Sequence, residues 1–140
     1  YCDRLIVVYN YRPLWGGENV ERFKLCASDL KFMSVVWDNE PLQSGELVKK
    51  SEERLGWKKS TTYTMIKKLS EKGLLENDNS MVRSLVPRET VQAYESEYVV
   101  NNAFSGSLPA FVAAFMSNKK LSDREVREIR ALIDKNRRCD

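Results

Sequence analysis

The side chains best suited to chemistry in this sequence are ammonium and hydroxyl groups gathered in one stretch, Trp57 to Lys72. The stretch holds five lysines against one glutamate, a net charge of +4, whereas the whole chain carries +3. Helical spacing gives it one apolar face, formed by Thr62, Met65, Ile66 and Leu69. The opposite face carries Lys58, Lys59, Ser60, Thr61, Tyr63, Thr64, Lys67 and Lys68. Ammonium groups neutralise phosphates and hydroxyls bond to base edges, so this face predicts binding in a major groove.

The ends of this helix are marked in the sequence. Trp57 precedes it as an apolar anchor, Ser60 or a neighbour caps its N-terminus, and Gly73 ends it as a C′ glycine. The segment from Leu55 to Glu76 therefore predicts a recognition helix followed by the first strand of a wing. Taken alone, the segment also fits a solvated basic helix on an unrelated domain.

Two helices are predicted before the basic one. Ser28 caps the first, which ends near Asp38-Asn39 and has its apolar positions at Leu30, Met33, Val36 and Trp37. Pro41-Leu42 forms a short extended link, where winged helices place a small first strand. Ser44 caps the second helix, and Gly56 stops it.

A β-hairpin is predicted after the basic helix. The segments 74–77 and 81–86 flank the polar turn cluster Asp78-Asn79-Ser80, and Arg83 is the only basic residue of this wing. We therefore predict a winged helix-turn-helix domain over residues 25–87. The fold class is mainly α with a small β-hairpin wing.

After Pro87 the sequence predicts three helical segments and no strand. They cover Arg88 to Asn102, Ser107 to Asn118, and a last helix opened by the capping-box sequence Ser122 to Glu125. About 50 residues of short helices can hardly bury their apolar stripes within one subunit, whereas a second copy can cover them. We predict a dimerisation domain over residues 88–140, with contacts from Tyr98, Phe104, Leu108, Phe111, Val112, Phe115, Met116, Val126, Ile129, Leu132 and Ile133.

The alternative for this C-terminal region is that its helices fold back onto the winged domain of the same chain. A dimer has a functional corollary, because two-fold symmetry presents two recognition helices to the two half-sites of a dyad in duplex DNA.

Residue types limit the other functions open to the chain. The three cysteines, Cys2, Cys26 and Cys139, lie far apart, and there is no histidine. Zinc sites and Ser-His-Asp or Cys-His catalytic groups therefore lack parts, so we expect no enzyme, metal, cofactor or small-molecule substrate. The unpaired cysteines indicate a cytoplasmic protein, and no apolar run approaches the roughly 20 residues that span a bilayer.

Residues 1–24 differ in texture from the rest and predict an N-terminal extension. The chain lacks an initiator methionine, and Gly16-Gly17-Glu18 could be encoded by codons resembling a ribosome-binding site, with Val20 as a GTG start codon. Residues 1–19 would then be translated leader. The alternative is a genuine arm that packs on the domain or reaches DNA.

From about Phe23 to Lys135, the chain resembles the penicillinase-repressor family of β-lactamase and methicillin-resistance repressors and their copper-responsive relatives. The resemblance rests on three segments in order, LCASDLKFMSVVWDNEPL, LGWKKSTTYTMIKKLSEKGLL and GSLPAFVAAFMSNKKLSDREVREIRALI. It implies a homodimeric transcriptional repressor bound to a dyad operator that overlaps promoters, with a β-lactamase or related resistance operon as target. It implies neither catalysis nor a cofactor.

The sequence departs from the family pattern at three places. The paired C-terminal cysteines of the copper-responsive branch are reduced to Cys139, which disfavours copper sensing. In the β-lactamase branch a membrane sensor protease system leads to cleavage at an Asn-Phe bond, and the matching bond here is Ala114-Phe115. The Gly-Arg common at the wing tip is replaced by Ser80-Met81.

We therefore expect repression by occlusion of polymerase, with the helix lysines and Arg83 on phosphates. Base edges are then read by Ser60, Thr61, Tyr63, Thr64 and Lys67. Tyr63 has an alternative role as a partly buried aromatic covering the preceding helix. Another class remains open, a protein-interaction module whose basic face binds an acidic partner. A small hydrolase would need a nucleophile and a base in one cleft, and the sequence offers no such pairing.

Overall fold

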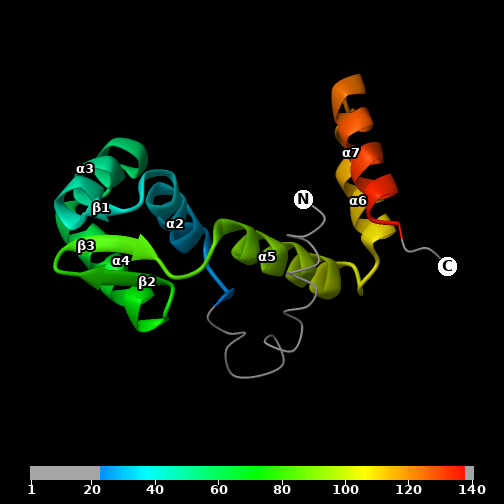
Figure 1. The fold of residues 1–140 in the computed structure, drawn as a ribbon. Helices are drawn as coiled ribbons and strands as arrows, with labels where there is room; N and C mark the ends of the chain where they lie inside the picture. The colour runs from blue at the N-terminus through cyan, green and yellow to red at the C-terminus, as the bar shows by residue number, and fades with distance from the viewer. Residues whose placement is uncertain (1–22, 138–140) are drawn as a thin grey trace. The chain divides into compact units, whose positions relative to one another are not determined.

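The computed structural model describes residues 23–137, which form six helices and a three-stranded sheet (Figure 1). In chain order the elements are α2 (Ala27–Asn39), β1 (Leu42–Gln43), α3 (Ser44–Leu55), α4 (Lys59–Glu71), β2 (Leu75–Asp78), β3 (Met81–Ser84), α5 (Arg88–Ala103), α6 (Leu108–Ser117) and α7 (Asp123–Lys135). The described chain forms two compact units that divide between Glu95 and Ser96. Our prediction of an N-terminal extension or arm covers residues 1–24 and that of a translated leader residues 1–19. Residues 1–22 lie outside the described part, whereas Phe23 is buried in the core of the first unit, so an extension that ends at residue 24 is one or two residues too long.

The first unit combines three helices with a small antiparallel sheet of strand order β1-β3-β2. Strands β2 and β3 form the wing hairpin, in which Asn77 lies opposite Val82, and β1 adds its short edge with Leu42 opposite the same residue. The two-residue turn of the hairpin uses Asn79 and Ser80 at φ 48° and 65°, the left-handed values that such tight turns require. The predicted fold class, mainly α with a β-hairpin wing, is confirmed.

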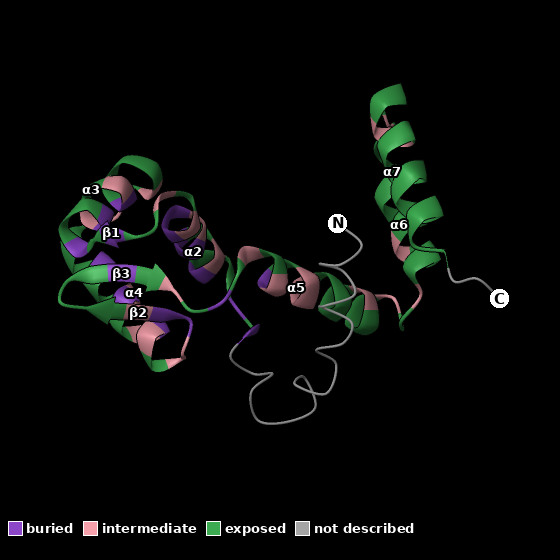
Figure 2. Ribbon diagram, viewed as in Figure 1, coloured by how far each residue is buried: buried purple, intermediate pink, exposed green. Residues whose placement is uncertain are grey.

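The core of this unit is built from the apolar faces of its helices and strands. Figure 2 shows buried residues concentrated along α2 and on the inner sides of the other elements. The side chains of Phe32, Leu47, Leu69, Leu74 and Val82 are fully buried. Because four of them belong to four different elements and Leu74 lies in the connection from α4 to β2, one shared core fixes α2, α3, α4 and the hairpin against one another.

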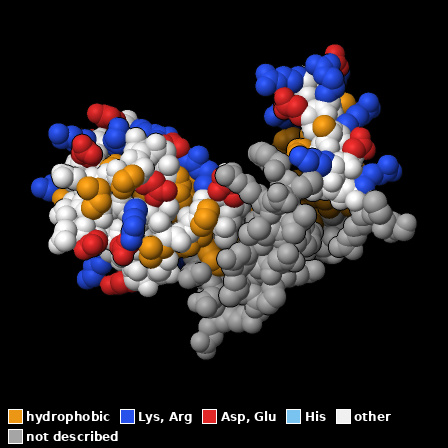
Figure 3. Space-filling view, viewed as in Figure 1, with side chains coloured by type: hydrophobic (Ala, Val, Ile, Leu, Met, Phe, Trp, Pro, Cys, Tyr) orange, Lys and Arg blue, Asp and Glu red, His pale blue; other side chains and the backbone are white. Residues whose placement is uncertain are grey.

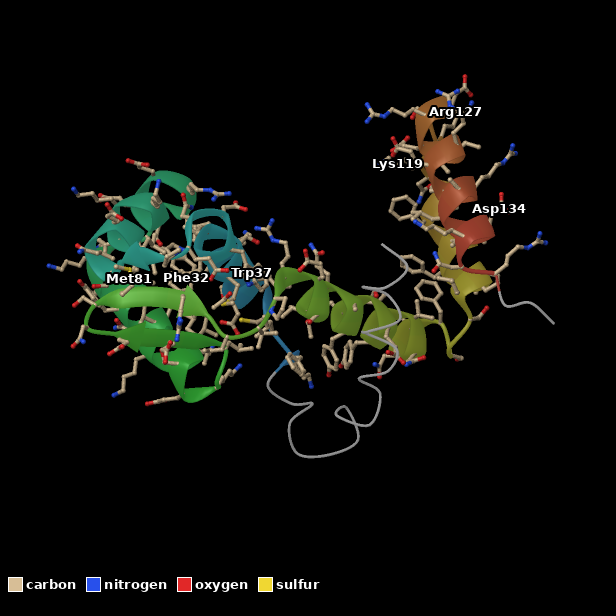
Figure 4. The ribbon with its side chains drawn as sticks, viewed as in Figure 1. Phe32, Trp37, Met81, Lys119, Arg127 and Asp134 are labelled. Atoms are coloured by element: carbon tan, nitrogen blue, oxygen red, sulfur yellow. The ribbon has the colours of Figure 1, made fainter. Side chains whose placement is uncertain are left out.

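Trp57 has the anchoring role predicted for it. Its indole ring stacks on the buried ring of Phe32, with centroids 5.7 Å apart and an interplanar angle of 13°. Phe32, labelled in Figure 4, comes from α2, so this stack joins the segment just before α4 to the first helix. Aromatic pairs of this kind add about 0.5–1.5 kcal/mol beyond their buried area.

The predicted serine caps are wrong for all three helices of the first unit. Helix α2 begins at Ala27 after Cys26, whose N–H donates to the Asp29 carboxylate at 3.4 Å. Helix α3 starts at Ser44 itself, and the Ser44 N–H donates to the carbonyl of Ser80 in the wing turn at 2.7 Å. Helix α4 begins at Lys59 without a side-chain cap. A local capping box between Cys26 and Asp29 therefore sets the start of α2, whereas a tertiary hydrogen bond and the Trp57 anchor set the starts of α3 and α4.

The predicted glycine stops are confirmed. Gly56 at φ 68° ends α3, and Gly73 at φ 76° follows α4. At the end of α4 the N–H of Leu74 donates to the Leu69 carbonyl and the N–H of Gly73 donates to that of Ser70, both at 3.0 Å. This is a Schellman motif, and it lets strand β2 begin only four residues after the helix ends.

The second unit holds the C-terminal part of α5 together with α6 and α7. The capping box predicted for α7 is confirmed, because Ser122 N–H donates to Glu125 Oε2 at 2.8 Å and Glu125 N–H donates to Ser122 Oγ at 3.2 Å. Ser107 likewise caps α6. None of the described residues from 96 to 137 is buried within the single chain.

Within residues 23–137, no single helix is long and apolar enough to cross a membrane. Helices α5 and α6 reach the required length and apolar character only as a pair, and a bend of 89° separates them.

Two glycines offer a matched test of backbone conformation. No atom lies within 4 Å of a Cβ built at Gly45 or Gly56, but only Gly56 has a positive φ. We expect Gly45→Ala, inside α3, to raise the free energy of unfolding by up to about 1 kcal/mol. Gly56→Ala should lower it by about 1–2 kcal/mol because an L-residue is strained there. Urea unfolding followed by circular dichroism measures both, and changes of the same sign would contradict this account.

Candidate nucleic-acid interface

Helix α4 exposes the polar face that the sequence predicts. Its buried side is formed by Thr62, Ile66 and Leu69, with relative exposures of 3% or less. The opposite side is exposed at Lys58, Lys59, Ser60, Thr61, Tyr63, Thr64 and Lys67. Burial of the first set therefore fixes the orientation of the second set toward solvent.

Local contacts order part of this exposed face. The Thr64 hydroxyl donates to the Ser60 carbonyl at 2.9 Å, so its proton is used within the helix while its oxygen can still accept. The Lys59 ammonium lies 5.9 Å from the centroid of the Tyr63 ring, a cation–π distance. Thr64 therefore offers an acceptor and a methyl group for base contact, and a methyl group can pack on the thymine methyl.

A shallow hollow adjoins the exposed face of α4. It has a volume of about 440 Å³ and is lined by Tyr63, Ile66, Lys67, Ser70, Glu71 and Asn77. Tyr63 is 40% exposed and Asn77 comes from strand β2, so the hollow lies between the recognition helix and the wing strand.

Two lysines of α4 and its C-cap contact a carboxylate of this chain. The ammonium of Lys68 lies 2.8 Å from Asp29 Oδ1, and the ammonium of Lys72 lies 3.7 Å from Asp29 Oδ2. Asp29 belongs to α2 and its side chain is 1% exposed. We predicted Lys68 as a phosphate contact, and in the structure its ammonium pairs with a buried carboxylate while 44% of its side chain remains exposed.

The pKa values of this pair reflect their contact. Burial raises the pKa of the Asp29 carboxyl, but the hydrogen bonds from Lys68 and Cys26 and the charge of Lys68 together lower it below its ordinary value. The hydrogen bond to Asp29 raises the pKa of the Lys68 ammonium. Both groups are therefore ionised at neutral pH, and the contact is an ion pair.

The wing carries the other predicted phosphate contact, Arg83. Its guanidinium donates from Nε to the carboxylate of Glu76, the residue opposite it in the hairpin. The Arg83 side chain is 61% exposed, so water screens this pair and a phosphate can compete for the guanidinium. At the wing tip, Ser80 and Met81 are exposed.

A hub centred on Asp38 was missed by sequence reasoning. Its carboxylate accepts from Arg54 Nη1 at 2.9 Å and from Arg88 Nη2, and these two hydrogen bonds, that from Arg88 first, lower its pKa. The Arg88 guanidinium also lies 5.5 Å from the Trp37 ring centroid, and Trp37 Nε1 donates to the Val86 carbonyl at 3.0 Å. The partners are up to 50 residues apart, so no local pattern signals the hub.

The residues predicted for dimerisation are uncovered within one chain. Large apolar side chains are 36–59% exposed at Leu108, Val112, Phe115, Met116, Ile129, Leu132, Ile133 and Tyr98. Phe104, Phe111 and Val126 are half-buried. In Figure 3 hydrophobic side chains appear among Lys and Arg on α6 and α7, and Figure 4 labels Arg127 and Asp134 on α7 and Lys119 in the connection between α6 and α7.

A metal site needs several His, Cys, Asp or Glu side chains close together. Among residues 23–137, no group of three or more His, Cys, Asp or Glu side chains could hold a metal ion. Cys26 is an exposed free thiol.

The three-helix unit, its hairpin wing and its basic hydroxyl-rich helix together define a winged-helix DNA-binding protein. Residues 25–135 match the family model described as Penicillinase repressor. The chain therefore belongs to the penicillinase repressor family, whose members are transcriptional repressors and not enzymes.

Several known proteins are similar to this chain. The methicillin resistance regulatory protein MecI of Staphylococcus aureus strain Mu50 is 22% identical over 117 residues, covering 81% of this chain and 95% of that protein. The penicillinase repressor of Bacillus licheniformis is 28% identical over 117 residues, covering 79% and 89%. A crystal structure of the multiple antibiotic-resistance repressor MarR from Listeria monocytogenes gives a TM-score of 0.44 at 16% identity, over 96% and 91%.

The Asp29 ion pair makes a pH-dependent contribution to stability. Because the folded-state pKa lies below the ordinary 3.8, the contribution is present above about pH 4 and is lost as the pH falls through the folded-state pKa. We expect Asp29→Asn to lower the free energy of unfolding at neutral pH by about 1–3 kcal/mol.

The difference between wild type and Asp29→Asn should shrink in acid. Urea unfolding at several values between about pH 7 and pH 2 measures this difference, and Asp134→Asn, at an exposed carboxylate of α7, serves as control. A difference that does not vary with pH would contradict the assignment.

Proposed function

We propose that this protein is a homodimeric, sequence-specific repressor that binds a dyad operator and controls a β-lactamase or related resistance operon. The observation that carries the proposal is the solvent-facing side of α4, where lysines and hydroxyls stand on a helix whose other side is locked in the core. Such a helix can enter a major groove as a rigid element. The related penicillinase and methicillin-resistance repressors support the choice of target.

The contacts divide by chemistry. We assign phosphate neutralisation to Lys58, Lys59 and Lys67, which form no ion pair among the described residues. Base reading is assigned to Ser60, Thr61, Tyr63 and Thr64, with Lys67 reaching either target. Arg83 contacts the DNA backbone beside the wing, where a phosphate replaces Glu76 as the partner of its guanidinium.

The dimer follows from the uncovered apolar surface of the second unit. Side chains such as Phe115, Leu132 and Ile133 on α6 and α7 are 47–57% exposed, and no residue among those described from 96 to 137 is buried. A contiguous patch of this kind on a protein in water marks an interaction surface. We therefore assign residues 25–87 to DNA binding and residues 88–140 to dimerisation, which places two recognition helices on the half-sites of one dyad.

Release of the operator is assigned to cleavage of the Ala114–Phe115 bond under a membrane sensor protease system. Both residues are exposed on α6, and the Phe115 ring lies 6.4 Å from that of Phe111. A protease needs extended backbone, so this turn of α6 has to open first, and cleavage then separates α7 from the DNA-binding domain.

The test is fluorescence anisotropy with a family-type dyad duplex and a scrambled duplex of equal length, each titrated at several salt concentrations. The proposal expects tight binding to the dyad, saturation at two chains per duplex and a steep salt slope. Equal or absent binding to both duplexes would instead favour a winged-helix interaction module that binds an acidic protein.

Lysine neutralisation tests the docking. We expect Lys67→Gln to reduce the steepness of log K against log salt by about 0.9, because one phosphate contact is lost. The control is Lys120→Gln, which removes the same charge from an exposed position between α6 and α7. The docking is wrong if the two variants give equal slopes.

Placing a carboxylate on either face of α7 tests the dimer. Ile133 is 57% exposed on the apolar face, whereas Ala131 is exposed two residues away on the polar face. We expect Ile133→Asp to shift the protein to monomer and weaken dyad binding at least tenfold, a change of about 1.4 kcal/mol. Ala131→Asp should leave both properties unchanged. Sedimentation velocity and anisotropy give the readouts, and a dimeric Ile133→Asp protein would refute this interface.

A further inference from the structure

The five lysines of the segment from Trp57 to Lys72 fall into two groups. Lys58, Lys59 and Lys67 are exposed and form no ion pair among the described residues. Lys68 and Lys72 instead contact the two oxygens of Asp29, at 2.8 Å and 3.7 Å. The proposed DNA-binding face therefore presents fewer free charges than the sequence suggests.

This division is maintained by the burial of Asp29. The carboxylate is 1% exposed, and a buried charge without compensation is strongly unfavourable. Its other contact is the Cys26 N–H at 3.4 Å, within the first turn of its own helix. If the ammonium groups of Lys68 and Lys72 moved to DNA phosphates, the Asp29 charge would be left nearly uncompensated. Phosphates therefore do not easily draw the two lysines away from Asp29.

The same contact constrains the orientation of α4. Burial of Ile66 and Leu69 determines which side of α4 faces solvent, but apolar packing is non-directional and by itself leaves small rotations about the helix axis open. Lys68 and Lys72 are one helical turn apart and both reach one carboxylate on α2, across 39 residues of sequence from Lys68. A charged hydrogen bond from Lys68 and a longer ion pair from Lys72, on the same edge of the helix, hold the rotation of α4 about its axis.

We infer that Asp29 is a positioning residue that determines specificity. By holding Lys68 and Lys72 away from phosphates and fixing the face that α4 presents, it weakens binding to DNA of any sequence more than binding to the operator. Non-specific binding depends almost wholly on phosphate neutralisation, whereas operator binding adds base contacts. Withholding two ammonium groups from phosphates therefore increases the ratio of operator affinity to non-specific affinity. The inference rests on the proposed DNA-binding function and extends it.

The test measures binding of Asp29→Asn to the dyad and scrambled duplexes over a range of salt. With its two lysines released, the variant should bind the scrambled duplex with a salt slope steeper than that of wild type by about 0.9 to 1.8. Over a fourfold decrease in salt, this gives an extra gain in affinity of about 3- to 12-fold. The ratio of dyad to scrambled affinity should narrow.

Two control variants separate this effect from a change of net charge. Glu53→Gln makes the same charge change at an exposed position of α3 and should leave the slope for scrambled DNA near that of wild type. Asp29→Glu keeps the charge and should restore the wild-type slope. The inference is overturned if Asp29→Asn keeps the wild-type slope and ratio, or if Glu53→Gln reproduces its effect.

The lysines provide a second test that does not require a folded Asp29→Asn protein. If Asp29 holds their ammonium groups, Lys68→Gln and Lys72→Gln should leave the slope for scrambled DNA unchanged, whereas Lys67→Gln lowers it. A loss of about 0.9 for Lys68→Gln would overturn the inference. Wild-type protein that binds neither duplex would instead overturn the proposed function, so the two failures are distinguishable.

Discussion

Burial of one side of α4 is the constraint on which the rest of the structure depends. Thr62, Ile66 and Leu69 are packed into the core, and the Schellman motif at Gly73 continues that packing into β2. Because a helix is rigid, fixing these three positions also fixes every residue on its opposite side. The position of the wing and the exposure of the polar face follow from the same buried contacts. The apolar positions of this helix therefore matter to its function as much as its charges do, because they orient the charged face.

The sequence predicted most of the fold because its signals are local. Hydrophobic periodicity located the helices, and Gly56, Gly73 and the Ser122 capping box marked three of their ends. The serine caps of the first unit failed because Cys26 and Asp29 cap α2 instead, while a hydrogen bond to the wing turn and packing of Trp57 decide the starts of α3 and α4. The ion pair of Asp29 with Lys68 could not be predicted, since it joins residues 39 apart whose types alone do not select a partner. The exposed residues of α4 could be predicted from spacing, but not which of its lysines are already paired.

The two units obtain their stability in different ways. The first has a core of its own that includes Phe32, Leu47 and Leu74, completed by the Asp38 hub that ties α2 to α3 and to the start of α5. The second has capped helices and aromatic contacts such as Phe104 with Phe111 at 5.4 Å, but no buried residue among those described. Under the proposed assembly, the stability of the second unit depends on protein concentration and that of the first does not.

The short connection between α4 and β2 has an evolutionary consequence. Lys72, Gly73 and Leu74 are the only residues between the helix and the wing strand, and two hydrogen bonds fold them back on the helix. An inserted or deleted residue there would offset strand β2 by one position against the helix and turn the buried side chain of Leu75 away from the core. Under the proposed function, new DNA sequence preferences are therefore accessible by exchanging side chains on a frame of constant length. Variation in loop length, a common route to new binding properties elsewhere, is closed at this point of the chain.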